Sequence, residues 1–124
     1  MTTRDSSLLA LRLWREARGQ SNAARLAILH VVLNRCAEHG QVPAQVILAN
    51  HQFSSFNATD PNVSKFPSPT DPIWIQCCAD VDNPGEDPTG GAQNYESCDP
   101  HKLPAWADLT KMTTMIAPFR FYKL

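Results

Sequence analysis

The stretch Ser6–Gly40, SSLLALRLWREARGQSNAARLAILHVVLNRCAEHG, decides the fold because it contains two apolar repeats of helical period and no proline. The first predicted helix is capped by Ser6 or Ser7 and runs to about Arg18, where Gly19 ends it. Leu9 and Leu13 recur in it at helical spacing, which indicates that this face of the helix packs in the core.

The second predicted helix is capped by Asn22, runs to about Ala37 and stops before Gly40. Its apolar side chains form a broad stripe that we expect to be core: Leu26, Leu29, Val32 and Leu33. Because all ten prolines stand at position 43 or later, the first 42 residues are predicted to be helical and the rest to be loops with short elements.

The second half is expected to hold three short elements and two long irregular segments. Pro43–Leu48 indicates one or two helical turns, and Asp71 with Pro72 is typical of the start of a helix that runs to about Asp82. Its apolar side chains are expected to be mostly buried: Ile73, Trp74, Cys77, Cys78 and Val81. Phe119–Tyr122 is predicted to be a strand or packed tail, residues 51–70 to be an ordered functional loop, and residues 83–104 to be a second long loop. The expected fold class is therefore predominantly α (α+β), with at most a small β element.

Composition excludes several classes of function. The 124 residues are enough for one domain, taken here as 1–124, and the net charge of −1 gives no basic surface for nucleic acid. No apolar run is long enough to cross a membrane, and Met1–Ser7 lacks the features of a signal peptide. The chain is thus expected to be made in the cytoplasm, to act as a monomer and to keep its four cysteines as free thiols.

Glu16 is the candidate catalytic residue. It lies seven residues after Leu9 and three after Leu13, so the three share the core-facing side of the first helix. A carboxylate is costly to bury in its ionised form, so this position favours the protonated form that a general acid needs. The alternative is a structural pairing of Glu16 with Arg12 or Arg15 at the edge of the helix.

No metal or cofactor is implied by the other polar clusters. The acidic run that begins at Asp80 resembles an EF-hand loop, but Pro84 and Gly91 stand where oxygen ligands belong, so a solvated loop is the favoured interpretation. Zinc at Cys98 and His101 is a weaker alternative, because no good second pair of ligands accompanies them.

Three ordered blocks of sequence resemble the SleB family of cell wall hydrolases. The blocks are Glu16–Gly19 followed by Val31–Arg35, then Gln52–Asn57 followed by Asp60–Asn62, and Asp87–Ala92 followed by Tyr95 and Pro104–Trp106. They cover most of the chain. The chain departs from the family's usual pattern at Gln20, at Asn94 and at Ala117–Phe119.

The resemblance implies a lysozyme-like domain that cleaves bacterial peptidoglycan between N-acetylmuramic acid and N-acetylglucosamine. It places the catalytic role on Glu16 and suggests that Gln52, Phe53, Ser54, Thr89 and Tyr95 line a substrate groove. From the residues themselves, Asn57 is a further candidate as a hydrogen-bonding amide and Trp106 as an aromatic face for the sugar. From the residues themselves, Phe53 and Trp106 fit the core as well as a groove, and Gly90 and Gly91 fit a plain turn as well as a close approach to ligand. Asn34 and Arg35 are expected to bond the loop ends.

The expected activity is that of a lytic transglycosylase or muramidase. Most glycoside hydrolases use two carboxylates, and the loops offer three further candidates: Asp60, Asp87 and Glu96. A single acid suffices if the substrate supplies the nucleophile. The alternatives are an N-acetylmuramoyl amidase and a non-catalytic peptidoglycan-binding or virion module. With no export signal, the chain is expected to reach the wall after release by a membrane-permeabilising partner, as phage endolysins do.

Overall fold

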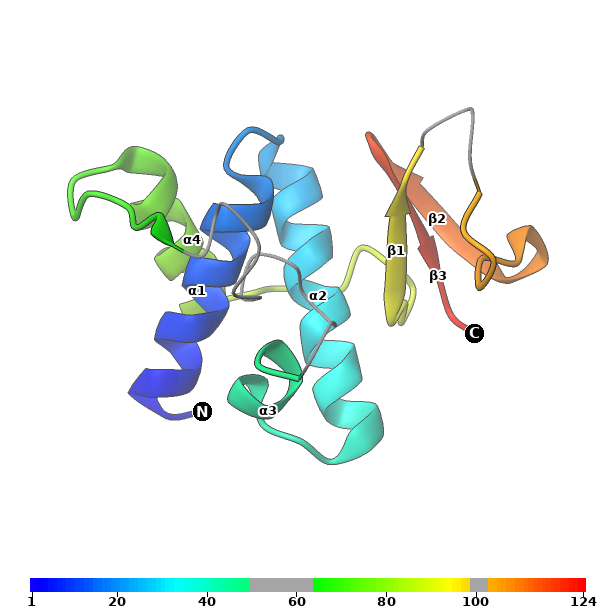
Figure 1. Ribbon diagram of the computed structural model, residues 1–124, viewed down its shortest axis with the longest axis horizontal. Coiled ribbons are helices and arrows are strands. Elements are labelled where there is room, and N and C mark those ends of the chain that lie inside the picture. The colour runs from blue at the N-terminus through cyan, green and yellow to red at the C-terminus, as the bar shows by residue number, and fades with distance from the viewer. Residues whose placement is uncertain (50–63, 99–102) are drawn as a thin grey trace.

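The computed structural model describes residues 1–49, 64–98 and 103–124, and it contains four α-helices and a three-stranded antiparallel sheet in that part of the chain (Figure 1). The helices are α1 (Thr3–Ala17), α2 (Asn22–His39), α3 (Pro43–Ile47) and α4 (Pro72–Asp82). The strands are β1 (Asn94–Ser97), β2 (Met112–Ile116) and β3 (Phe119–Tyr122), with a 3₁₀ turn at Leu109–Lys111. The predicted α+β class is confirmed.

The first helix begins earlier than its sequence indicated. Thr2 caps α1 and forms a capping box with Asp5, so Ser6 and Ser7 lie inside the helix and the prediction that one of them caps it is wrong. The capping box is favoured over a cap at Ser6 or Ser7 because it satisfies two backbone donors at once, Asp5 N and Thr2 N. Asp5 also accepts a hydrogen bond from Ala44 N at 3.1 Å, which ties the start of α1 to α3.

The other helices agree with their end signals to within two residues. Ser21, rather than the expected Asn22, caps α2 through Ala24 N, and Gly40 ends the helix with a φ of 60°. The short helix at Pro43 and the cap of α4 by Asp71 are confirmed. In α4, Cys77 and Val81 are buried, whereas Ile73, Trp74 and Cys78 are only partly buried.

The helix α2 lies between the other helices and the sheet (Figure 1). On one side Leu29 and Val32 pack with α1, α3 and α4 in the main core, as predicted, and Leu26 and Leu33 are partly buried against it. On the other side Ala27 and Val31 pack against Phe121 of the sheet. Because α2 is covered on both sides, it is the rigid element that relates the two halves of the molecule.

The sheet is larger than the sequence indicated. Its strand order is β1-β3-β2, so Phe119–Tyr122, predicted as a strand or tail, is the central strand. The segment 83–104 was predicted to be irregular, but it contains β1, whose four residues pair with β3 from Asn94↔Tyr122 to Ser97↔Phe119. Four residues are too few for an alternating pattern to stand out, so this pairing depends on the tertiary structure.

None of the helices in the described ranges combines the length and the apolar character that crossing a membrane requires.

Candidate active site

The last turns of α1 are held by side chains that bond to the neighbouring segments. Trp14 Nε1 donates to Asp71 Oδ2 at 3.0 Å, and Arg15 Nε donates to the Lys65 carbonyl at 3.0 Å. Arg18 lies over the Trp14 ring, 4.6 Å from its centroid, and donates to the Arg15 carbonyl at 2.8 Å. A cation that bonds the last carbonyls stabilises a helix end. The C-terminal end of α1 is therefore a rigid platform.

Glu16 lies on this platform and is partly buried, between the buried residues Arg15 and Ala17. Leu9 and Leu13, with which it was predicted to share a face, are fully buried in the core. Glu16 is also one helical turn from Arg12, so the side chains of these two residues lie on the same side of α1.

Arg12 connects this side of α1 to the sheet. The guanidinium is fully buried, and its Nη2 donates to the hydroxyl of Tyr95, 83 residues away on β1. The same guanidinium lies 5.7 Å from the centroid of the Tyr95 ring. Glu16 is thus on the side of α1 that meets Tyr95. Sequence reasoning considered Arg12 only as a partner for Glu16, because nothing local in the sequence points to so distant a contact.

Tyr95 is held in place by aromatic neighbours as well. Its ring packs edge-on against Phe119, with centroids 5.4 Å apart, and tilted against Phe121 at 6.0 Å. Trp106 lies elsewhere on the sheet: it packs edge-on against Tyr122 at 5.4 Å and keeps 43% of its surface exposed. Trp106 therefore combines a packed edge with an accessible surface.

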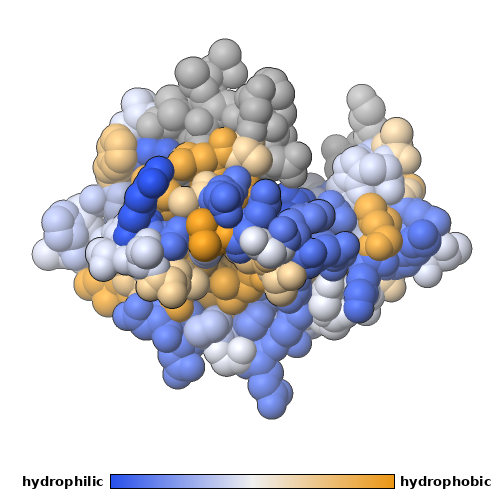
Figure 2. All heavy atoms as spheres, turned by 90° about the horizontal axis from the view of Figure 1, so that it is seen from below, coloured by the Kyte–Doolittle hydropathy of each residue, from blue (hydrophilic) through white to orange (hydrophobic). Residues whose placement is uncertain are grey.

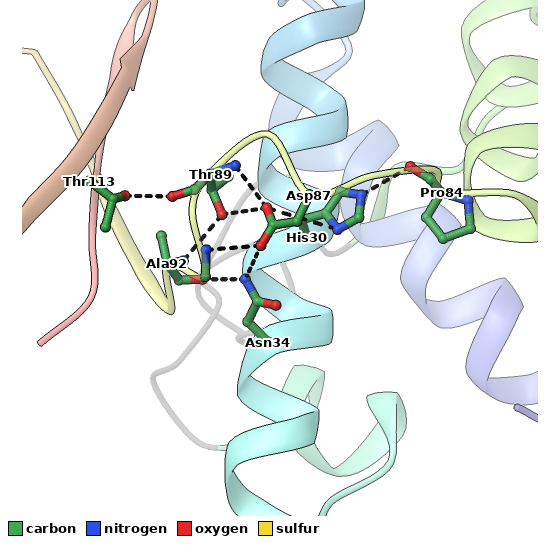
Figure 3. A network of polar contacts seen from close by, with 8 residues as sticks. His30, Asn34, Pro84, Asp87, Thr89, Ala92 and Thr113 are labelled. Atoms are coloured by element: carbon green, nitrogen blue, oxygen red, sulfur yellow. Dashed lines mark hydrogen bonds and ion pairs between the residues drawn. The ribbon is translucent and has the colours of Figure 1, made fainter.

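The loop that carries the block Asp87–Ala92 is closed by its own hydrogen bonds (Figure 3). Asp87 accepts from the backbone N–H of Thr89 at 2.8 Å and of Gly91 at 3.0 Å, and from the Thr89 hydroxyl at 2.6 Å. Gly90 and Gly91 have φ values of 68° and 84°, which only glycine adopts without strain. The two glycines thus serve the turn.

The same loop is bonded to α2 and to β2. Asn34 Nδ2 donates to Asp87 Oδ2 and to the Ala92 carbonyl, both at 2.9 Å, and His30 Nε2 lies 2.9 Å from the Pro84 carbonyl. From β2, the Thr113 hydroxyl donates to the Thr89 carbonyl at 2.6 Å (Figure 3). The irregular register between Met112 and Thr114 leaves Thr113 outside the ladder of strand pairs. The loop is therefore part of the scaffold.

Thr89 was predicted to line the substrate groove, and its position does not agree with that role. The residue is fully buried, and its hydroxyl donates to Asp87 and accepts from Ala92 N. With no exposed surface and both hydrogen-bonding roles used, Thr89 supports the loop. Asn34 and Arg35 were predicted to bond the loop ends, and this is confirmed, since Arg35 donates to the Gln93 carbonyl and to Asn94 Oδ1.

Two candidates for a second catalytic carboxylate are bound into the scaffold. Glu96 accepts from Arg120 through both of its oxygens and from the Tyr122 hydroxyl at 3.0 Å. The Arg120 hydrogen bond holds the pKa of Glu96 below its ordinary value despite burial. Burial also acts to raise the pKa of Asp87, but the hydrogen bonds from Thr89, Asn34 and Gly91 outweigh it and lower that pKa. Both carboxylates are used for structure in their ionised forms.

The cysteines are free thiols. Burial raises the pKa of Cys77 to about 11, and it raises the pKa of Cys36 and of Cys78 as well. A protonated thiol is a poor nucleophile and a poor metal ligand. Within residues 1–49, 64–98 and 103–124, no three His, Cys, Asp or Glu side chains lie close enough together to hold a metal ion.

Several predicted site residues lie outside the described residues. They are the four groove candidates Gln52, Phe53, Ser54 and Asn57, the possible second acid Asp60, and the possible zinc ligand His101.

A groove of about 600 Å³ lies between the end of α2, the α3 region and the start of β1. Its lining is mixed in character and consists of Arg35, Glu38, His39, Gln41, Val46, Ala49, Gln93, Asn94 and Leu124. Figure 2 looks onto the end of the molecule where α3 lies, and on this face hydrophobic areas border hydrophilic ones. No candidate residue from the sequence belongs to the lining, although Asn94 directly precedes Tyr95.

In a comparison with protein families, residues 19–122 match a family model described as Cell Wall Hydrolase. The match includes the Asp87 loop, Tyr95 and Trp106, and it begins three residues after Glu16. Searches of curated proteins and of solved structures find no match to the chain.

Proposed function

The chain belongs to the cell wall hydrolase family, and from that premise we propose that it cleaves the glycan strand of peptidoglycan with Glu16 as general acid and base. Peptidoglycan degradation follows from the family. The scissile bond, between N-acetylmuramic acid and N-acetylglucosamine, and the role of Glu16 are our proposal, as is the lysozyme-like character of the domain.

The observation that carries the proposal is the position of Glu16 beside the contact between Arg12 and Tyr95. A general acid must be held at a fixed place near the reacting atom, partly shielded from water. Glu16 is partly buried, stands at the rigid end of α1, and shares a helix side with Arg12, whose guanidinium bonds the Tyr95 hydroxyl. The sugar would bind on this side, with Tyr95 as one wall.

In the first step the Glu16 carboxylic acid gives its proton to the glycosidic oxygen. The bond from that oxygen to C1 of the muramic acid breaks, its electron pair stays on the oxygen, and N-acetylglucosamine leaves as the alcohol. In the second step the C6 hydroxyl of the same muramic acid attacks C1 and gives its proton to the Glu16 carboxylate. The product is a 1,6-anhydro end, and the acid is regenerated.

A mechanism with a single catalytic acid agrees with the hydrogen bonds of Glu96 and Asp87, the two candidates for a second acid that the structure describes. An inverting or retaining glycosidase needs a second carboxylate to activate water or to act as nucleophile. Glu96 and Asp87 are committed to Arg120 and to the Thr89 turn, so neither offers an oxygen for that purpose. With the C6 hydroxyl as nucleophile, none is needed. Attack by water, which would make the enzyme a muramidase, is the next candidate.

Mass spectrometry of the fragments released from purified cell walls tests the proposal. We expect anhydromuramic ends from the wild-type protein and no fragments from Glu16→Gln. Reducing muramic ends would assign hydrolysis instead. Release of peptides with intact glycan would show an amidase, and binding to walls without any release would show a non-catalytic module. Either of these last two results contradicts the proposal.

A further inference from the structure

We propose that the groove at the end of α2 binds the stem peptide of peptidoglycan, with Glu38 receiving the side-chain ammonium of the diamino residue. This inference rests on the proposed function, since it assigns a second part of the same substrate to a second place on the protein. The groove has no role in the proposed cleavage chemistry, because neither Glu16 nor Tyr95 lines it.

The charges of the groove do not match a glycan. Arg35, Glu38 and His39 follow each other at i, i+3 and i+4 on the last turns of α2, so they face the same side. Glycan strands of N-acetylated sugars offer hydroxyl and acetamido groups without charge, apart from the lactyl group, which the stem peptide caps as an amide. The stem peptide carries both signs: carboxylates, and an ammonium at its diamino residue. A wall with both signs is complementary to the peptide.

The rest of the lining suits a short peptide made of small residues. Gln41, Gln93 and Asn94 provide amide groups that pair with peptide bonds, and Val46, Ala49 and Leu124 provide an apolar surface for alanine methyl groups. A volume of about 600 Å³ is within the range of roughly 300–1,000 Å³ that small-ligand sites occupy. Gln93 Nε2 donates to Glu38 Oε2, which orients that carboxylate at the groove wall.

The groove is connected to the candidate active site by a short series of contacts. Arg35 Nη2 donates to Asn94 Oδ1 at 3.3 Å, and the next residue, Tyr95, bonds Arg12. Burial lowers the pKa of Arg35, and the charge of Arg12 lowers it further. Since the stem peptide hangs from the muramic acid next to the scissile bond, a peptide site on this side of the molecule is where the substrate requires it.

The test is an NMR titration with the synthetic peptide L-Ala-γ-D-Glu-L-Lys and with its norleucine analogue, which has the same length but lacks the ammonium. We expect the lysine peptide to shift the signals of His39, Gln93 and Leu124 and to bind about tenfold more tightly than the analogue, the effect of one charge-assisted hydrogen bond. In Glu38→Gln the two peptides should bind equally. The matched control, Glu86→Gln, changes an exposed residue outside the groove and should keep the preference.

The inference is overturned if neither peptide binds, if the wild type does not distinguish them, or if Glu38→Gln still prefers lysine. These results are separate from the outcome for Glu16, because the titration involves no cleavage. Loss of lysis in Glu16→Gln together with no peptide binding would support the proposed function and contradict the peptide site. Peptide binding together with unchanged lysis by Glu16→Gln would support the peptide site and contradict the role of Glu16.

Discussion

The Asp87 loop and the end of α1 both belong to sequence blocks that resemble cell wall hydrolases, yet they are built for different purposes. In the loop, the hydrogen bonds of Asp87 and Thr89 join these two residues to each other, to Gly91 and to α2. At the end of α1, the bonds of Trp14, Arg15 and Arg18 hold the helix while Glu16 stands partly buried beside Arg12. In the loop the polar residues of a family block make the scaffold, whereas at the end of α1 we propose that the scaffold presents Glu16 to the substrate.

The largest effect should come from Glu16→Gln. The amide keeps the shape of the side chain but cannot give and take the proton, so the rate of wall lysis should fall by about 10²–10⁴. The melting temperature should stay close to that of the wild type. The control is Glu86→Gln, a change of the same kind at an exposed site, which should leave lysis unchanged. A Glu16→Gln protein that lyses walls at the wild-type rate would assign this glutamate to the scaffold as well.

The next effect is on stability, in Glu96→Gln. The substitution leaves the Arg120 guanidinium beside a neutral amide in a buried part of the sheet, so the free energy of unfolding should fall by about 2–3 kcal/mol. Urea unfolding followed by circular dichroism measures this. Lysis per folded molecule should remain, because Glu96 has no part in the proposed chemistry. A folded Glu96→Gln protein without activity would instead make Glu96 the second carboxylate.

Asp87→Asn should have a smaller effect of the same type. The amide can accept with its oxygen, but its NH₂ group meets donors from Thr89 or Gly91, so we expect a loss of about 1–2 kcal/mol. Relative to the wild type, the rate of amide hydrogen exchange should increase most at Gly91 and Ala92. If exchange at the loop does not change, the hydrogen bonds of Asp87 contribute little and the loop is held by its other contacts, among them those of His30, Asn34 and Thr113.

The smallest effect is the pH dependence of the losses in unfolding free energy caused by Asp87→Asn and Glu96→Gln. The pKa values of Asp87 and Glu96 are lowered from ordinary values of 3.8 and 4.5, so their stabilisation is complete above about pH 5 and is lost as the pH falls through the lowered values. The difference in unfolding free energy between the wild type and the double variant Asp87→Asn, Glu96→Gln should therefore narrow on acidification. A difference that stays constant down to pH 3 would contradict this sign.

Local signals predicted the helices well, and their errors have local causes. The stop at Gly40 and the start at Asp71-Pro72 agree with the structure because each depends on one residue's own backbone preference. The start of α1 was misplaced because several good capping residues compete there, among them Thr2, Ser6 and Ser7, and only Thr2 has an acidic residue three positions later that completes the box. The strand β1 was missed because four residues are too few to show the alternation of apolar and polar side chains that indicates a strand.

For the candidate site, the ordered blocks of sequence led to the prediction of Glu16 and Tyr95, which stays a prediction. The sequence also predicted that Asn34 and Arg35 bond the loop ends, which is confirmed. Only the tertiary structure decided that Thr89 is buried, that Glu96 belongs to Arg120, and that Arg12 reaches Tyr95. The physical reason is the range of the interactions. Helix caps and turns are set by residues within four positions of each other, which a sequence displays directly. Burial and hydrogen-bond partners are set by segments that meet after folding, such as α1 and β1, 83 residues apart.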